Sequence, residues 1–312
     1  LARLTLTGLF CLTSVATAEA AATLTLSRGS GPPTTAVTAT VRGFSPGKRV
    51  DVYFGTRAQC VLVPAANGSG ACSFKVPASA QPQTHWITAA VRVTGSAVQR
   101  AFAVRTDWPN AHGLTVTNDG FNRYENAITA KNAHLLEPVW TAVPNDLVNT
   151  SPIVVAGRVY VTTMNGKLYA VDGTTGATVT GFPKTAGPAT GTYYSSPTIA
   201  GGIVYQATVE LDSTSRIQAY NAATGAAVAG FPKSLAGYAY GNPIVVDGKL
   251  FIGASDGKIY GFNAATGATL ANYPITLPGA VRTISSPAYY QGLLYIGADD
   301  GTLVDAEWLN HL

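Results

Sequence analysis

The chain has 312 residues and a net charge of +4, and its charged residues, only 12% of the total, form no run of Lys or Arg. A nucleic-acid-binding surface needs a basic stripe, so we expect no nucleic-acid partner. The four His residues lack metal-ligand spacing, which argues against a His-based metal site. The 33 Gly and 18 Pro favour an all-β chain of short strands and tight turns.

Residues 1–20 are typical of an export signal. Arg3 is followed by an apolar run from Leu4 to Val15 and then by two overlapping small-residue sites, Ala16-Thr17-Ala18 and Ala18-Glu19-Ala20. The run is too short to span a bilayer, and no later apolar segment is long enough. We therefore expect a signal peptide and an exported protein (extracellular, cell-surface or periplasmic) without a transmembrane anchor. The alternative is that this run forms a buried strand.

Residues 22–106 are predicted to form a β-sandwich. Seven short runs alternate apolar and polar residues, as strands with one buried face do, and turn signals separate them at intervals of about 8–12 residues. The apolar positions are Leu24 and Leu26; Val37, Ala39 and Val41; Val50, Val52 and Phe54; Val61 and Val63; Phe74 and Val76; Ile87, Ala89, Val91 and Val93; and Phe102 and Val104.

This pattern, together with the stretch from Gln83 to Ala89 (Gln-Thr-His-Trp-Ile-Thr-Ala), resembles small immunoglobulin-like modules of secreted bacterial proteins. The resemblance implies an immunoglobulin-like β-sandwich that acts as a spacer or an adhesive unit.

Two cysteines, Cys60 and Cys72, remain after the signal peptide and its Cys11 are removed. An even count in an exported chain predicts a disulfide. Asn67-Gly68-Ser69-Gly70 between them is a turn signal, so we expect the disulfide to staple the two arms of a hairpin. The alternative is two unlinked, buried thiols.

Residues 107–149 form a less periodic junction and lead-in segment that starts at Asp107-Trp108-Pro109. From residue 150 to 312 one unit recurs at a fixed period, which marks a supersecondary structure copied in series. Its signature prolines are separated by 45, 46 and 44 residues and lie in Ser151-Pro152, Ser196-Pro197, Asn242-Pro243 and Ser286-Pro287.

Each repeat is predicted to hold four strands, which in the first repeat are residues 153–155, 159–162, 167–171 and 177–180. Three turn signals recur. The first joins strands one and two, at Ala156-Gly157, Gly201-Gly202, Asp247-Gly248 and Gln291-Gly292. The second joins strands two and three, at Asn165-Gly166, Asp256-Gly257 and Asp300-Gly301, where Asn-Gly and Asp-Gly favour a type I′ hairpin turn. The third is Asp172 to Gly176, Asn221 to Gly225 and Asn263 to Gly267, in which the Asp or Asn can bond to its own loop.

Four antiparallel strands in about 45 residues make the blade of a β-propeller. The runs Leu168 to Gly176, Ile217 to Gly225 and Ile259 to Gly267 resemble the repeat of pyrroloquinoline-quinone (PQQ)-type propellers. This repeat occurs in quinoprotein dehydrogenases and in non-enzymatic scaffolds such as the outer-membrane barrel-assembly lipoprotein, and such propellers generally close with seven or eight blades.

The resemblance to quinoprotein dehydrogenases would imply a calcium site of Glu, Asn and Asp and often adjacent cysteines. The repeats contain no cysteine, and their few carboxylates lie mostly in turns. We therefore predict no catalytic residue, no metal and no cofactor. The alternative is a fragment of a PQQ- and calcium-dependent dehydrogenase whose catalytic blades are missing.

The fourth repeat ends early, since Val304 to Trp308 lack the expected aromatic residue and Asx turn. We expect about four blades of an incomplete propeller and a chain that is a fragment of a longer protein. The alternative is the assembly of two half-rings.

Loops leading into each first strand should approach the propeller axis and form a rim. Aromatic and polar side chains there could bind a protein or a carbohydrate. Alternatively, they plug the channel or pack between blades. The candidate rim residues are Asn149, Tyr193, Tyr194, Tyr238, Tyr240 and Arg282. The sequence thus favours a non-enzymatic exported binding or scaffold protein.

Overall fold

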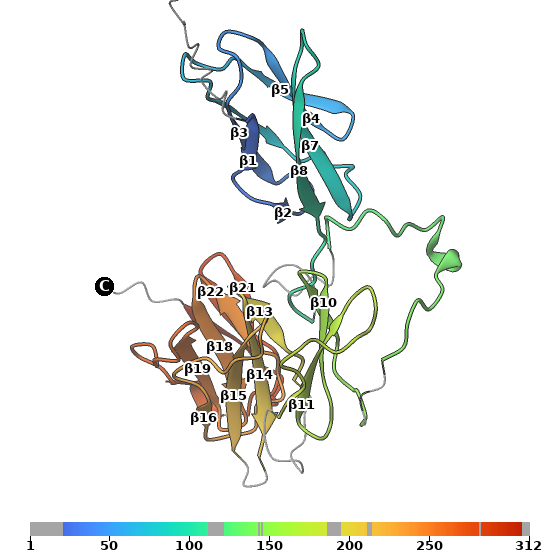
Figure 1. Cartoon of the computed structure of the whole chain (residues 1–312). Helices are drawn as coiled ribbons and strands as arrows, with labels where there is room; N and C mark the ends of the chain where they lie inside the picture. Colours follow the sequence, from blue (N-terminus) through green and yellow to red (C-terminus); the bar gives the residue numbers. More distant parts are fainter. Residues whose placement is uncertain are drawn as a thin grey trace, which may run out of the picture. The chain divides into compact units, whose positions relative to one another are not determined.

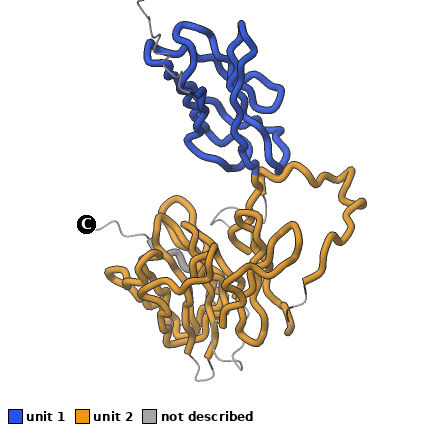
Figure 2. Tube along the Cα trace, in the orientation of Figure 1, with its two compact units in different colours: residues 1–104 blue, residues 105–312 orange. Residues whose placement is uncertain are grey.

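The computed structural model describes residues 21–111, 122–142, 144, 146–185, 195–210, 214–280 and 282–307. The expected signal peptide, residues 1–20, lies outside these residues. The chain divides into two compact units, residues 1–104 (unit 1) and 105–312 (unit 2; Figure 2). Both are built of strands, with two short 3-10 helices at Ala133–Leu135 and Pro278–Ala280 in the described part. No described helix is long and apolar enough to cross a membrane.

Unit 1 consists of two sheets that share one hydrophobic core (Figure 1). Alternate strand residues, among them Val37, Val52 and Ile87, are fully buried in this core. The three-stranded sheet has the order β1 (Thr23–Leu26), β3 (Ala36–Arg42), β6 (Gly70–Lys75). The five-stranded sheet has the order β2 (Ser30–Gly31), β8 (Ala97–Val104), β7 (Thr84–Val91), β4 (Val50–Phe54), β5 (Arg57–Leu62).

The predicted buried face of β5 was wrong. Val61 and Val63 are 42% and 56% exposed, whereas Leu62 between them is 5% exposed. The cause is the pairing with β4, which sets Leu62 opposite the buried Val50 and shifts register between Val52 and Tyr53. Because side chains alternate with period two, this register turns both valines to the surface.

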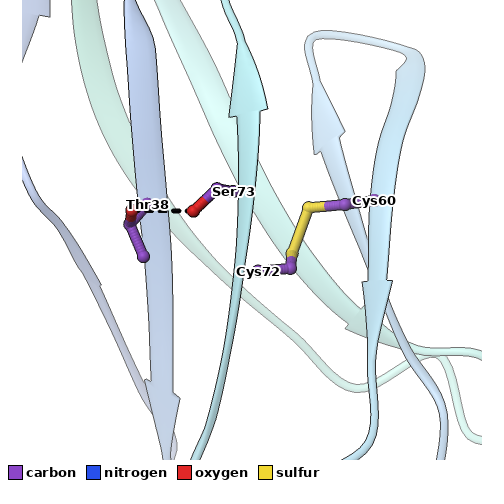
Figure 3. Close-up of a disulfide and its surroundings, with 4 residues drawn as sticks. All are labelled: Thr38, Cys60, Cys72 and Ser73. Carbon is purple, nitrogen blue, oxygen red and sulfur yellow. Dashed lines mark hydrogen bonds between the residues drawn. A yellow bond between two sulfur atoms is a disulfide. The ribbon is translucent and has the colours of Figure 1, made fainter.

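The disulfide between Cys60 and Cys72 is present, but the predicted hairpin is not. Cys60 lies on β5 and Cys72 on β6, and these strands belong to different sheets (Figure 3). The intervening chain crosses from one sheet to the other through a turn in which Asn67 Oδ1 accepts the Ser69 N–H at 3.0 Å. The disulfide therefore ties the two sheets of unit 1 together across a separation of 12 residues.

The described residues of unit 2 form four antiparallel sheets, which we call blades A to D (Figure 1). Blade A is β9 (Ile153–Val155), β10 (Arg158–Thr162), β11 (Lys167–Asp172) and β12 (Lys184–Thr185). Blade B is β13 (Thr198–Ala200), β14 (Ile203–Val209), β15 (Ser215–Asn221) and β16 (Lys233–Leu235). Blade C is β17 (Ile244–Val246), β18 (Lys249–Ala254), β19 (Lys258–Asn263) and β20 (Ile275–Thr276). Blade D has three strands, β21 (Ala288–Tyr290), β22 (Leu293–Gly297) and β23 (Leu303–Glu307).

The turns between strands two and three differ from the prediction. Only their glycines, Gly166, Gly257 and Gly301, have positive φ, so these turns are not type I′. Both central residues have positive φ instead in the turns between strands one and two, for example Asp247 (46°) and Gly248 (74°). An Asn-Gly or Asp-Gly dipeptide alone does not determine the turn type, because the pairing of the two flanking strands also fixes the length of the loop between them.

The predicted fourth strand at residues 177–180 was also wrong. After each Asx turn the chain makes a single bridge, such as Val171 with Thr178, and then leaves the sheet at a residue with positive φ, which is Gly181 in blade A, Gly230 in blade B and Asn272 in blade C. It rejoins the blade as β12 only at Lys184. This detour inserts an aromatic residue into the core, and Phe182 packs edge-on against Tyr160 at 6.0 Å between ring centroids.

Neighbouring blades bury apolar faces against each other, and we call each such interface a seam. Tyr160 and Tyr205 cross the first two seams, where their hydroxyls donate to the carbonyl oxygens of Ala222 (2.7 Å) and Ala264 (2.9 Å) in the next blade. Burial raises the pKa of Tyr205 to about 12, so its hydroxyl stays protonated and remains a donor.

A chain of hydrogen bonds links the blades at the signature Ser/Asn-Pro positions. The N–H of Ser151 donates to Ser196 Oγ (2.9 Å), that of Ser196 to Asn242 Oδ1 (2.6 Å), and that of Asn242 to Ser286 Oγ (2.9 Å). Each bond joins the main chain of one blade to a side chain of the next. The recurring Ser or Asn therefore supplies the acceptor that crosses the seam.

Asn242→Ala is expected to destabilise unit 2, because Ser196 is buried and its N–H would lose its acceptor. An unsatisfied buried donor costs about 1–3 kcal/mol. Asn242→Ser restores an acceptor of the kind that the other repeats use and should lose less than half as much. Urea unfolding of the three proteins measures the difference. Equal losses in both variants would contradict the role of the side-chain oxygen.

Candidate functional site

The loops that lead into the first strands and the turns between strands two and three lie at the same end of the blades. In the described residues this end, which we call the rim face, comprises 146–150, 163–166, 236–242, 255–257, 282–286 and 298–301. Antiparallel order puts these segments together, because strand two of each blade ends where strand one begins.

One main-chain hydrogen bond recurs across the rim face and joins residues 17 positions apart. The N–H of Met164 donates to the carbonyl oxygen of Leu147, that of Ser255 to Tyr238, and that of Asp299 to Arg282, all at 2.8–2.9 Å. We call this bond the clasp. It sets Leu147, Tyr238 and Arg282 at equivalent positions in blades A, C and D.

The structure fixes two of the predicted rim residues firmly. The Tyr238 N–H donates to Ser255 Oγ (2.8 Å) in addition to the clasp, so both sides of this residue are tied to the turn. The Tyr238 and Tyr240 rings stack with centroids 5.6 Å apart and an angle of 26° between planes. Both side chains are half-buried, so part of each remains exposed to solvent.

The other predicted rim residues have different surroundings. Arg282 faces Asp299 at 3.6 Å, and because both side chains are exposed this pair contributes little stability. Asn149 is exposed, next to the buried Thr150. Tyr193 and Tyr194 lie outside the described residues. The sequence interpretation missed Leu147, which is 72% exposed, although the 17-residue spacing to the following turn could have revealed it.

A polar network supports the rim face of blade C. The Tyr260 hydroxyl donates to Asp256 Oδ2 (2.7 Å) and accepts the N–H of Ala236 (3.1 Å), and Lys258 Nζ lies 3.4 Å from the same carboxylate oxygen. Burial, followed by the bond to Asp256, raises the pKa of Tyr260 to about 12. The Oδ2 atom of Asp256 is thus engaged by two side chains of β19.

The junction after unit 1 occupies the inner edge of blade A. Trp108 exchanges two main-chain hydrogen bonds with Val154 on β9 (2.6 and 2.8 Å), and the Pro109 carbonyl oxygen accepts the N–H of Ile199 on β13. Asp107 Oδ1 accepts the Ala156 N–H at 3.2 Å, and burial is the main cause that raises the pKa of Asp107. The sequence interpretation treated this stretch only as a boundary.

The Asx turns lie at the opposite end of the blades and carry most of the remaining polar groups. Asp172 Oδ1 accepts the N–H groups of Thr174 and Thr175 at 2.9 Å and the Thr175 hydroxyl at 3.1 Å. Asn221 and Asn263 accept the corresponding N–H groups in blades B and C at 2.9–3.0 Å. The predicted bonding of the Asp or Asn to its own loop is confirmed.

The turn of blade A is expected to respond to acid, whereas the turns of blades B and C are not. The Thr175 N–H, then the Thr174 N–H and the Thr175 hydroxyl, hold the pKa of Asp172 below its ordinary value of 3.8. Since the folded pKa is depressed, the stabilisation is complete above the unfolded pKa and is lost as the pH falls through the folded one. NMR amide shifts of Thr174 and Thr175 should titrate with a midpoint below 3.8.

Asp172→Asn is the matched control, because asparagine already serves in the other two turns. It should abolish the acid titration of the Thr174 and Thr175 amides and leave Thr224 unchanged. A Thr224 amide that moves in parallel with Thr175 would show a general acid effect instead.

The chemistry of the rim face suits binding. Its described residues offer an aromatic pair, an arginine and an exposed leucine, whereas Asp256 Oδ2 accepts the Tyr260 hydroxyl of β19 and Asp300 is bonded within its own turn. The described residues hold no group of three or more His, Cys, Asp or Glu side chains able to share a metal ion.

A family profile described as "Outer membrane protein assembly factor BamB" matches residues 92–230 and, in a second, overlapping match, residues 125–310. The second match alone covers more than half of the chain. The chain belongs to this family. The repeats that form blades A to D are PQQ-like repeats. No curated protein matches the chain.

Among solved structures, BamB from Moraxella catarrhalis is 21% identical over 49% of this chain and 43% of that chain, with a TM-score of 0.39. Quinohemoprotein alcohol dehydrogenase ADHIIG from Pseudomonas putida HK5 is 22% identical over 47% of this chain and 28% of that chain (TM-score 0.37). The computationally designed Ika4 protein is 16% identical over 55% of this chain and 98% of that chain (TM-score 0.42). The match therefore spans less than half the length of the Moraxella BamB.

Proposed function

We propose that the chain is a non-enzymatic, exported scaffold that binds a protein partner at the rim face of its PQQ-like β-propeller. The observation that carries the proposal is the clasp, which presents Leu147, Tyr238 and Arg282 at one position in three blades. Aromatic residues and arginine are the side chains that most often dominate protein interfaces. Membership of a family named for outer membrane protein assembly also supports a protein partner.

For unit 1 we propose an immunoglobulin-like module that acts as a spacer or adhesive unit, and for residues 1–20 an export signal. The two sheets around one core support the first proposal. The disulfide supports the second, because such bonds persist in oxidising compartments. The absence of a cofactor remains a prediction, supported by carboxylates that hydrogen bonds within their own blades engage.

Short peptides that cover the sequence of an outer-membrane β-barrel protein are the probe for this proposal. We expect saturable binding of a subset of them, measured by fluorescence anisotropy. Tyr238→Ala and Arg282→Ala should each weaken binding by about tenfold or more, as loss of interface anchors does. Trp86→Ala, which removes an exposed aromatic residue of unit 1, should leave binding unchanged.

Two other outcomes would overturn the proposal. Binding of oligosaccharides in place of peptides, with the same dependence on Tyr238, would assign the rim face to a carbohydrate. A saturable absorbance change with pyrroloquinoline quinone and Ca²⁺ would favour the dehydrogenase-fragment alternative.

A further inference from the structure

The outer face of the five-stranded sheet of unit 1 carries an exposed tryptophan. Trp86 lies on β7 and is 53% exposed. Its neighbours across the sheet are Ala101 on β8, directly opposite in the register, and Gly55, whose N–H donates to the Trp86 carbonyl oxygen at 2.8 Å. A Cβ atom added at Gly55 would meet nothing within 4 Å, so the space on that side is open. The nearest neighbours of the indole ring are therefore too small to cover it.

The residues on both sides of Trp86 fix its main chain. Ile87 is fully buried in the core. His85 packs toward the core as well, where its ring lies on Phe54 with centroids 4.7 Å apart and its Nε2–H donates to the Gln81 carbonyl oxygen at 2.9 Å. Because the strand is anchored on both sides of Trp86, a ligand that binds there needs to order only the side chain.

Aromatic and polar side chains accompany Trp86 on the same face. Tyr53 on β4 is the register partner of Thr88, two residues beyond Trp86, so the two aromatic residues are diagonal neighbours on adjacent strands. Gln99 on β8 is also opposite Thr88, and its Nε2–H donates to the Thr88 hydroxyl oxygen at 2.9 Å. The Thr88 hydroxyl proton and Gln99 Oε1 retain the capacity to bond to a ligand. The face thus combines flat rings with neutral hydrogen-bonding groups.

The outward positions around Trp86 are almost free of charge. Residues 21–104 are all described, and by register the outward positions of the three central strands are Asp51 and Tyr53 on β4, Thr84, Trp86, Thr88 and Ala90 on β7, and Ala97, Gln99, Ala101 and Ala103 on β8. Asp51 is the one charged residue among them, and Arg92 donates to both of its carboxylate oxygens. Asp51 is opposite Ala90, four residues along β7 from Trp86, which corresponds to about 13 Å.

The arginines nearest in the sheet lie away from Trp86. Arg57 and Arg100 are opposite the buried Phe54 and Ile87 and so belong to the other face. Arg49 lies two residues before Asp51, at the same end of the face as the ion pair with Arg92. The surface next to Trp86 is therefore complementary to an uncharged ligand, whereas an acidic one would find its opposite charges at the far end.

We propose that this face binds a neutral polysaccharide, with a pyranose ring stacked on Trp86 and sugar hydroxyls bonded to Thr88 and Gln99. A pyranose offers an apolar C–H face to an aromatic plane and hydroxyl groups at its edge, which matches an open indole beside a hydroxyl and an amide. A protein partner fits less well, because the outward positions are rich in alanine, a residue depleted in protein interfaces. The inference rests on the adhesive role proposed for unit 1 and gives that role a ligand.

Isothermal titration calorimetry of the full chain with cellohexaose, maltohexaose and N-acetylchitohexaose tests the inference. We expect saturable binding of at least one of these neutral sugars. Trp86→Ala should raise its dissociation constant by about tenfold, and Trp86→Tyr should retain most of the affinity because it keeps an aromatic plane. Val93→Ala, which shortens an exposed apolar side chain in the loop between β7 and β8, is the matched control and should bind as the wild type does. Circular dichroism confirms that all variants fold.

Tyr238→Ala separates this site from the rim face, since it should weaken peptide binding and leave sugar binding unchanged. A full chain that binds none of the three sugars, or a Trp86→Ala variant that binds them like the wild type, overturns the inference and leaves the proposed peptide site intact. Preferential, salt-sensitive binding of polygalacturonate would assign the affinity to Arg49 and Arg92 and overturn it too. A wild-type dimer that Trp86→Ala dissociates, measured by sedimentation equilibrium, would make the face an interface between copies instead.

Discussion

Replacing Gly230 with alanine is expected to destabilise unit 2 by about 2–5 kcal/mol. Gly230 has a φ of 86°, a conformation that costs other residues about 1–2 kcal/mol. A Cβ atom there would also overlap the carbonyl oxygen of Thr266, in the Asx turn of the next blade. Because a main-chain atom cannot rotate away from such a contact, blades B and C must separate slightly. Overpacking of this kind lowers the free energy of unfolding by about 1–3 kcal/mol more.

Gly248→Ala separates the two contributions. Gly248 has a φ of 74°, but nothing lies within 4 Å of the position that its Cβ would take. This variant should therefore lose only the conformational part, about 1–2 kcal/mol. Urea unfolding followed by circular dichroism measures both. Equal losses would mean that the close approach between blades contributes nothing to the stability of the seam.

Removing the disulfide by Cys60→Ala and Cys72→Ala is expected to destabilise unit 1 by about 3 kcal/mol, the value for a closed loop of this length. The bond joins two sheets rather than two arms of one hairpin, and its loss restores conformational entropy to the unfolded chain. For a domain of this size the melting temperature should fall by about 10–20 °C. Differential scanning calorimetry resolves the effect, with the transition of unit 2 as an internal reference.

Ser73→Ala is the control next to the disulfide. It removes only the exposed hydrogen bond between the Thr38 and Ser73 hydroxyls (2.9 Å; Figure 3). Its cost should stay within about 1 kcal/mol. A double cysteine variant that melts with the wild type would show that core packing alone holds the two sheets.

Local signals in the sequence predicted much of unit 2. The predictions of the Asx turns and of the repeat period were correct. An Asx turn depends on the φ preferences of a few consecutive residues, and the repeat period follows directly from the spacing of the motifs along the chain. The fourth strands were misplaced because the detour at Gly181 serves a contact with the next blade, which adjacent residues do not encode.

In unit 1 the errors have one physical origin. Whether Cys60 and Cys72 share a hairpin, and whether Val61 faces the core, depends on which distant strand pairs with β5. Alternation gives the period of a strand but not its partner. The Ser/Asn-Pro positions show the same limit, since their spacing was evident but the bond from Ser196 to Asn242 exists only once the blades stack.

The clasp does not depend on which side chains occupy residues 147, 238 and 282. Its hydrogen bonds use only the amide and carbonyl groups of the backbone, so a leucine, a tyrosine and an arginine occupy one structural position without altering it. Residues 147, 238 and 282 can consequently be randomised together, and the propeller should tolerate nearly any combination. The side chains at these three positions can therefore vary while the backbone of the propeller stays the same.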